Sequence, residues 1–186
     1  MAGLPYSTSA LLAEDDISFL RRARKHALGR ISVNEIRDAM YMTIQDGGRT
    51  ISAEALDYAV HATDGFPYMM QLVGYRMWAE NPASEEITQS DVEHGVKLAQ
   101  DEMVDGILEY TYRDLSKGDR RFLEAMLEDD AVSSISDIAR RMGVKSNYAS
   151  QYKRRLLARG VIGEPQKGYV RFELPMMREY LEARLD

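Results

Sequence analysis

The chain has 186 residues, 45% of them hydrophobic, and its 24 Lys and Arg against 30 Asp and Glu give a net charge of −6. This length suits one domain or two small ones with a packed core. The sequence contains no cysteine, which excludes disulfides and thiol chemistry, and its three histidines lie too far apart to suggest a metal site. No apolar run approaches the ~18 residues of a membrane span, and the first residues lack a signal-peptide pattern. We therefore expect a cytoplasmic protein without a membrane partner.

The charge is distributed unevenly along the chain. Residues 1–113 hold 10 basic and 18 acidic side chains, whereas residues 114–186 hold 14 and 12. Within residues 140–171, nine Lys and Arg side chains stand against a single acid, Glu164. An asymmetry of this kind predicts two modules with different partners.

Several segments begin with a helix-capping pattern, a Ser or Thr followed three residues later by an acid. In this arrangement two side chains satisfy backbone donors that the first turn of a helix leaves free. The pairs are Ser32/Glu35, Thr88/Asp91, Ser116/Asp119 and Ser134/Asp137. They predict a mostly helical chain.

Residues 32–113 are predicted to form a small bundle of four helices. The first follows Ser32, the second follows Ser52, and the third begins at Pro67, whose missing N–H costs nothing in a first turn. The fourth is a long helix that starts at Thr88. Its expected inward positions are Val92, Val96, Ala99, Met103, Ile107 and Tyr110. Tyr75 and Trp78 are also expected in the core of the bundle.

A second module is predicted from about Ser116. It contains a first helix, a short helix over residues 136–142, a turn at Gly143 and a basic helix that ends at Gly160. We expect Tyr148, Tyr152 and Leu156 of the basic helix to face inward. Val161-Ile162, a polar turn at residues 164–168 and a run over residues 169–174 that alternates in polarity then predict a β-hairpin. This order is that of a winged helix-turn-helix, so the predicted fold is mainly α with a small β wing.

The outer face of the basic helix is a candidate for binding DNA. Lys and Arg neutralise phosphates, while Ser, Asn and Gln can hydrogen-bond to base edges or phosphates. Two basic residues of the hairpin would contact the DNA backbone or the minor groove. The candidate DNA-binding residues are Lys145, Ser146, Asn147, Ser150, Gln151, Lys153, Arg154, Arg155, Lys167 and Arg171. A protein-docking face and a merely solvated surface remain alternatives, because a fold does not fix a function.

The order of several segments resembles the C-terminal part of bacterial and archaeal ATPases of the AAA/STAND type. TDGFPYMMQLVGYRMW (63–78) resembles their lid segment, in which G-x-P precedes an amphipathic helix. AGLP (2–5) is similar to the segment that leaves the nucleotide-binding core, and ITQSDVEHGV (87–96) resembles the last lid helix. YRDLSKGDRRFLEAM (112–126) and GYVRFELPMMREYL (168–181) resemble the entry and the wing of their winged helix.

This resemblance implies a division into three parts. Residues 1–31 would connect to an ATPase core, residues 32–113 would form the helical lid subdomain, and residues 114–186 the winged-helix domain. The sequence has no G-x-x-x-x-G-K-[ST] motif and no strand that ends in paired acids, so the chain itself is not expected to be an enzyme. It would be the C-terminal part of an ATPase whose core binds ATP or ADP with Mg²⁺, and that core would be one of its partners.

The resemblance also implies a nucleotide site and a mechanism. In the relatives the Pro of G-x-P approaches the adenine, and Gly65, Phe66 and Pro67 match that motif here. Without the core, the same residues simply stop one helix and start another. No Arg occupies the turn that follows, and Arg76 is the substitute candidate for a phosphate sensor. Nucleotide state would then control DNA binding by the winged helix; the alternative is a signalling or scaffold ATPase whose winged helix binds a protein.

Overall fold

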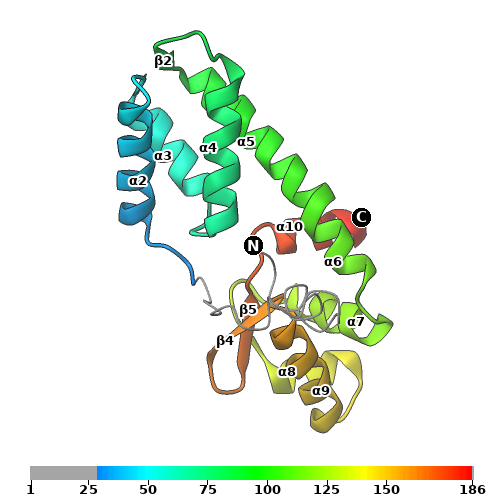
Figure 1. Ribbon diagram of the computed structural model, residues 1–186. Coiled ribbons are helices and arrows are strands. Elements are labelled where there is room, and N and C mark those ends of the chain that lie inside the picture. Colours follow the sequence, from blue (N-terminus) through cyan, green and yellow to red (C-terminus); the bar gives the residue numbers. More distant parts are fainter. Residues whose placement is uncertain (1–28, 186) are drawn as a thin grey trace, which may run out of the picture. The chain divides into compact units, whose positions relative to one another are not determined.

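The computed structural model describes residues 29–185 of the chain (Figure 1). These residues form helices, a two-stranded parallel sheet and a three-stranded antiparallel sheet, and they divide into two compact units, residues 29–109 and residues 110–185. The predicted fold class, a helical bundle followed by a winged helix, is confirmed. The division falls within the helical segment that the sequence assigned to the first module. Of the expected connector, residues 1–28 lie outside the described part of the chain.

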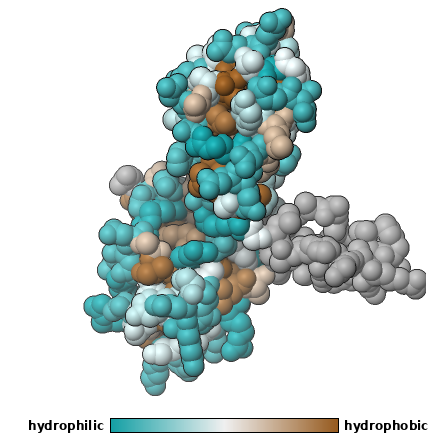
Figure 2. Space-filling view, turned by 90° about the vertical axis from the view of Figure 1, so that its left-hand side faces the viewer, coloured by the Kyte–Doolittle hydropathy of each residue, from teal (hydrophilic) through white to brown (hydrophobic). Residues whose placement is uncertain are grey.

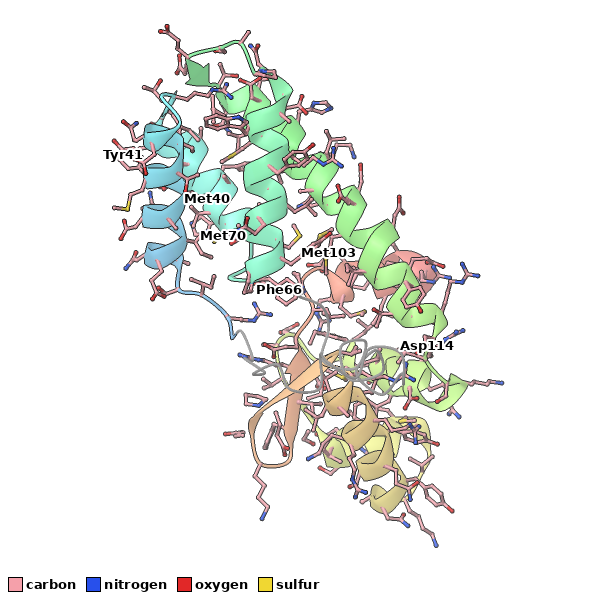
Figure 3. The ribbon with its side chains drawn as sticks, viewed as in Figure 1. Met40, Tyr41, Phe66, Met70, Met103 and Asp114 are labelled. Atoms are coloured by element: carbon pink, nitrogen blue, oxygen red, sulfur yellow. The ribbon has the colours of Figure 1, made fainter. Side chains whose placement is uncertain are left out.

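The first unit is built on four α-helices that lie beside one another (Figure 1). They are α2 (Val33–Asp46), α3 (Ala53–Ala62), α4 (Pro67–Glu80) and α5 (Gln89–Met103). Each helix turns an apolar stripe into a common core. On α2, Met40 points toward the other helices and is buried, whereas its neighbour Tyr41 points outward (Figure 3). The core of the unit thus follows the helical period that the sequence shows.

The predicted helix caps are present in both units. Ser32 accepts a hydrogen bond from the Glu35 N–H, and the Glu35 carboxylate accepts one from the Ser32 N–H, so the capping box is complete. Thr88 and Asp91 make the same reciprocal pair at the start of α5. In the second unit, α7 and α8 each begin with a Ser whose side chain accepts a hydrogen bond from the backbone N–H three residues later. These pairs are Ser116 with Asp119 and Ser134 with Asp137.

A buried arginine, which lies in no sequence motif, ties the end of α4 to a neighbouring loop. Arg49 is 5% exposed, and its guanidinium donates to the carbonyl oxygens of Trp78 (2.9 Å), Asn81 (3.0 Å) and Glu86 (3.2 Å). The guanidinium also lies 4.8 Å from the ring centre of Trp78. Three carbonyl groups thereby gain donors, and both terminal nitrogens of the buried Arg49 guanidinium are hydrogen-bonded. The loop carries β2 (Glu86–Ile87), which pairs in parallel with β1 (Thr50–Ile51).

The long helix predicted from Thr88 is interrupted. It continues past α5 as a π-helical turn, η2 (Val104–Leu108), and then as α6 (Glu109–Arg113). A π turn inserts one residue, so every later side chain rotates away from its expected position. Leu108 is buried in place of Ile107, and Tyr110 is 71% exposed while Thr111 is buried. The prediction that Ile107 and Tyr110 both point inward was therefore wrong.

Helix α4 packs against α5 through one close backbone approach. A Cβ added at Gly95 of α5 would lie 2.5 Å from the backbone nitrogen of Met77 and 2.6 Å from its Cα. The inward stripe of α4 contains Met69, Leu72, Val73 and Met77. Tyr75 lies outside this stripe and is 63% exposed, so its expected place in the core was wrong.

The second unit is a winged helix. Its elements are α7 (Lys117–Met126), β3 (Ser133–Ser134), α8 (Ile135–Met142), α9 (Ser146–Ala158), β4 (Ile162–Gln166), β5 (Tyr169–Phe172) and α10 (Met177–Leu185). The sheet is antiparallel in the order β3-β5-β4, so the predicted hairpin gains a third short strand. Its core is mostly apolar, although Asp119 and Ser133 are also buried in this unit. The core side chains include Phe122, Leu123, Met126, Ile138, Leu156, Val161, Val170 and Leu181.

The turn between α8 and α9 depends on a glycine. Gly143 has φ +66° and donates its N–H to the end of α8, which is the left-handed cap predicted there.

On the face of the molecule in Figure 2, hydrophilic side chains predominate and hydrophobic ones are exposed at scattered places. Within residues 29–185, none of the helices combines the length and apolar character needed to cross a membrane.

We predict that Gly95→Ala destabilises the first unit by about 2 kcal/mol, because the new methyl group would collide with the backbone of α4. Gly106→Ala is the matched control, since no heavy atom lies within 4 Å of its added Cβ. There the better helix propensity of alanine should leave stability unchanged or slightly higher. Thermal unfolding of both variants measures the effect, and equal midpoints would contradict the close packing of α4 on α5.

Candidate nucleic-acid interface

The rotation of α9 decides which side chains the winged helix presents. Ala149 and Leu156 are fully buried and Tyr152 is half-buried, so these residues define the inner face. Tyr148, predicted to face inward, is 51% exposed. Residues four apart are rotated by about 40° from one another around the helix axis, so the predicted set Tyr148, Tyr152 and Leu156 drifts steadily in one direction. The set Ala149, Tyr152 and Leu156 combines a step of three with a step of four, whose rotations are opposite, and it therefore stays on one side of the helix. The small apolar residue Ala149 was the signal in the sequence that could have indicated which side of the helix faces the core.

The exposed arc of α9 is defined here as the side chains that face away from the core along its first three turns. Its members are Lys145, Ser146, Asn147, Tyr148, Ser150, Gln151 and Arg154. Asn147, Gln151 and Arg154 follow one another at spacings of four and three, which places them on one line along the helix. No acidic residue occurs anywhere on α9. The arc therefore combines amides, hydroxyls, one aromatic ring and two cations.

Arg155 is held within the fold. Its Nη2 lies 2.7 Å from Asp119 Oδ1, and its Nε lies 3.2 Å from the same oxygen. The Asp119 side chain is only 3% exposed and also accepts the Ser116 hydroxyl at 2.5 Å. A buried carboxylate is costly unless it is paired, so this ion pair fixes α9 on α7. Arg155 was predicted to contact DNA, and its structural role competes with that use.

A second ion pair joins α9 to the wing. Lys153 Nζ lies 2.8 Å from Glu164 Oε1 in β4, and Glu164 also accepts the N–H of Gly168 at 3.0 Å. The Lys153 ammonium, together with that N–H, lowers the pKa of the Glu164 carboxyl. Within the hairpin, Arg171 Nε lies 3.4 Å from Glu173. Lys153 and Arg171, two further candidates for DNA contact, therefore already have acidic partners.

The remaining candidates are divided by their partners. Lys145, Arg154 and Lys167 are exposed and make no side-chain hydrogen bond or ion pair within residues 29–185. The Ser150 hydroxyl donates to the Ser146 carbonyl at 2.9 Å. The structure thus brings Lys145 and Arg154 together with Asn147 and Gln151 on one exposed arc, and places Lys167 at the turn of the wing.

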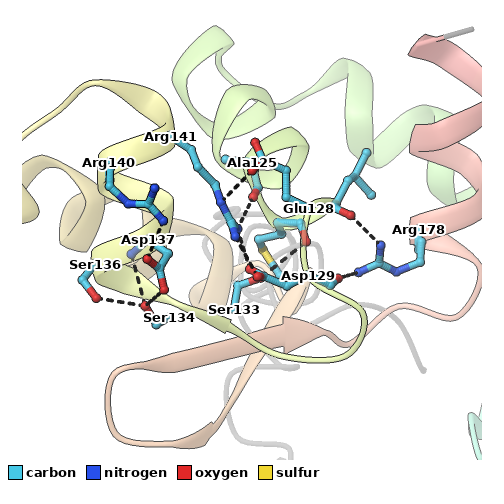
Figure 4. Close-up of polar contacts among 12 residues, drawn as sticks. Ala125, Glu128, Asp129, Ser133, Ser134, Ser136, Asp137, Arg140, Arg141 and Arg178 are labelled. Atoms are coloured by element: carbon cyan, nitrogen blue, oxygen red, sulfur yellow. Dashed lines mark hydrogen bonds and ion pairs between the residues drawn. The ribbon is translucent and has the colours of Figure 1, made fainter.

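The helix-turn-helix frame rests on a second arginine–carboxylate pair (Figure 4). Arg141 of α8 donates to both oxygens of Asp129, at 2.5 and 2.7 Å, and to the carbonyl of Ala125 at 2.8 Å. Arg178 of α10 donates to the carbonyls of Leu127 and Asp129. The hydrogen bond from Arg141 lowers the pKa of Asp129 to about 2. The loop after α7 is therefore clamped from two helices.

The predicted nucleotide-side residues form a turn and a helix start in the first unit. Gly65 has φ +71° and its carbonyl accepts the Ile31 N–H at 2.8 Å, while Phe66 and Pro67 are the N-cap and first residue of α4. A pocket of ≈ 320 Å³ lies beside Gly65, but neither Phe66 nor Pro67 lines it. The residues that line it are Arg30, Ile31, Ser32, Val33, Val60, His61, Asp64 and Gly65.

Arg76, the substitute candidate for a phosphate sensor, is engaged elsewhere. Its Nε lies 3.0 Å from Glu102 Oε2 on α5, so it already neutralises a carboxylate. The part of the chain that the structure describes also contains no cluster of three or more His, Cys, Asp or Glu that could hold a metal ion.

Comparisons with known proteins give a limited match. Residues 105–181 match a family model described as a domain of unknown function, DUF8462. The matched residues are less than half of the chain. No curated protein in the comparison matches it. Structures of RuvB from Thermotoga maritima, one described as a Holliday junction branch migration motor and two of mutants, are similar at 16% identity and TM-score 0.39. Each match covers 83% of this chain and 50% of the RuvB chain, so this chain spans about half the length of RuvB.

We predict that Asp129→Asn destabilises the protein at pH 7 by about 1–2 kcal/mol, a figure reduced from the full pKa shift because the carboxylate is 26% exposed. The pKa of Asp129 is lowered from 3.8 to about 2. Its stabilisation is therefore complete above about pH 4 and is lost as the pH falls toward 2.

Denaturant unfolding of both proteins across pH 2–7 checks this, and the difference in stability should shrink below pH 4. Asp130→Asn is the control, because this exposed neighbour makes no ion pair within the described residues. A difference that stays constant down to pH 2 would show that the ion pair with Arg141 contributes no stability.

Proposed function

We propose that this chain is the C-terminal part of an ATPase of the AAA/STAND type, and that its winged helix binds duplex DNA. The single observation that supports DNA binding is the exposed arc of α9, which is free of acids in a protein of net charge −6. The resemblance of the lid segment supports the ATPase parent. The chain contributes no catalytic residue in this proposal; ATP or ADP with Mg²⁺ would bind to the parent's core, with Gly65, Phe66 and Pro67 on the adenine side.

The arrangement of α9 suits the major groove. An exposed α-helix fits that groove, where amide and guanidinium groups reach base edges and cations contact phosphates. Lys145 lies at the start of α9 and Arg154 lies on the exposed arc. Lys167, in the turn between β4 and β5, would contact the DNA backbone beside the wing.

The number of unpaired cations sets the expected salt dependence. Lys153, Arg155 and Arg171 have acidic partners, which leaves Lys145, Arg154 and Lys167. Because each neutralised phosphate contributes about −0.9 to the slope of log K against log salt, three contacts predict a slope of about −2.7. Affinity should then fall about 40-fold between 50 and 200 mM salt. A slope of about −5.4, which six contacts predict, would mean that the ion pairs of Lys153, Arg155 and Arg171 open on binding.

We predict that Arg154→Glu weakens binding to a random-sequence duplex at least tenfold at low salt, because it replaces an attraction by a repulsion at the phosphates. Fluorescence anisotropy measures the affinity. Arg113→Glu is the matched control, since it makes the same charge change on an exposed residue of α6. Arg155 is left unchanged, because its loss would leave the buried Asp119 carboxylate without its cation and would destabilise the fold.

Unchanged binding in Arg154→Glu, or no binding at low salt, would contradict the DNA proposal. The exposed arc would then serve as a protein-docking face, the second candidate function. The observation that favours this alternative is the exposure of the Tyr148 ring together with the small number of unpaired cations. An interface centred on Tyr148 would be insensitive to salt and lost in Tyr148→Ala.

We further predict that nucleotide changes the DNA affinity of the parent ATPase. Control of this kind requires that DNA and nucleotide each alter the other's affinity by the same factor. DNA affinity of the parent protein should therefore differ at least fivefold between the ADP form and a non-hydrolysable ATP analogue. Nucleotide affinity, measured with and without duplex, provides the reciprocal control. Equal affinities in both nucleotide states would leave the winged helix a constitutive DNA binder.

A further inference from the structure

Beyond charge, the exposed arc of α9 carries groups that distinguish bases. We propose that the winged helix reads A·T base pairs in the major groove, with Asn147 and Gln151 contacting adenine and Tyr148 packing on the methyl group of thymine. This inference rests on the proposed function, because it requires that α9 enters a DNA groove.

Asn147 and Gln151 are placed to act as a pair. They are separated by four residues, so their side chains lie on the same side of α9 about one turn apart. Both are exposed, and neither side-chain amide makes a hydrogen bond within the described residues. A carboxamide matches adenine in the major groove, because its oxygen accepts from N6 while its NH₂ donates to N7.

The chemistry of the arc also limits what else it can read. A carboxylate is the usual partner of the N4 amino group of cytosine, and α9 has no acid. A guanidinium is the usual partner of guanine, and Arg154 is the arc's single guanidinium. Lys145 also lies on the arc and can contact guanine, but the proposed function assigns Lys145 and Arg154 to phosphates, which leaves the two amides as the readers of bases. This balance favours a site centred on A·T pairs.

Tyr148 supplies an apolar contact at the edge of the same arc. It lies one residue after Asn147 and three before Gln151, which places its ring beside the amides. The ring is 51% exposed, and no aromatic ring or guanidinium of the described residues stacks on it. Tyr152, one turn further on, is instead covered by Arg155 at 4.9 Å. An uncovered ring next to adenine-reading amides can pack against the thymine C5-methyl, which only A·T pairs present.

Four duplexes of equal length test the inference, made of alternating A·T, A·U, G·C and I·C pairs. A·U lacks the thymine methyl group. I·C presents the major groove of G·C but lacks the guanine N2 amino group in the minor groove, as A·T does. The intact chain should bind A·T about tenfold more tightly than G·C or I·C, with A·U in between. Fluorescence anisotropy at constant salt gives the four affinities.

The variants separate the two kinds of reader. Tyr148→Ala should bind A·T and A·U equally, whereas Asn147→Ala and Gln151→Ala should each reduce the preference for A·T over I·C and keep their affinity for G·C. Asn34→Ala is the control and should change none of the four affinities, because it makes the same truncation at an exposed position of α2, outside the exposed arc.

Three outcomes overturn the inference in different ways. Equal affinity for all four duplexes overturns base reading and leaves the proposed function intact. Equal and tight binding of A·T and I·C would show that the protein reads the minor groove. Failure to bind any duplex overturns the proposed function itself, together with this inference.

Discussion

The winged helix depends on one buried carboxylate, Asp119, and on the arginine that neutralises it. Asp119 sits in the first turn of α7, where it accepts the Ser116 hydroxyl, and Arg155 reaches it from α9. Because an unpaired charge at this depth would be costly, α9 has a preferred rotation on α7. Tyr152 packs against Gly118 on the same side, where an added Cβ would lie 2.5 Å from its ring. The face that α9 presents is therefore a consequence of how this carboxylate is paired.

The basic character of the segment has two separate origins. Arg141, Lys153 and Arg155 carry their charges toward Asp129, Glu164 and Asp119, so they hold helices and the wing together. Such pairs stabilise through geometry and hydrogen bonds more than through charge alone. Only the cations that lack such partners are available to an anionic ligand. A count of Lys and Arg in the sequence therefore overstates the electrostatic attraction that this surface can exert.

Local signals in the sequence predicted most of the fold, and longer-range packing accounts for the errors. The capping pairs and the turn at Gly143 depend on residues a few positions apart, so their patterns could be read directly. The π turn at Val104–Leu108 has no comparable pattern, and it rotated Tyr110 out of the core. The partners of Lys153, Arg155 and Arg171 could not be assigned either. The acids opposite Lys153 and Arg155 lie 11 and 36 residues away, and only the folded chain brings them together.

The misplaced tyrosine shows how such an error changes a functional argument. With Tyr148 inside, the outer face of α9 would be a polar and basic strip suited to any anionic polymer. With Ala149 inside, a ring joins two amides on the exposed arc. Cations attract phosphates irrespective of sequence, whereas amides and an apolar ring distinguish one base edge from another. The rotation that Asp119 favours for α9 thus adds an apolar ring to the amides and cations of the exposed arc, so that under the DNA-binding proposal this surface would offer base-selective contacts as well as phosphate contacts.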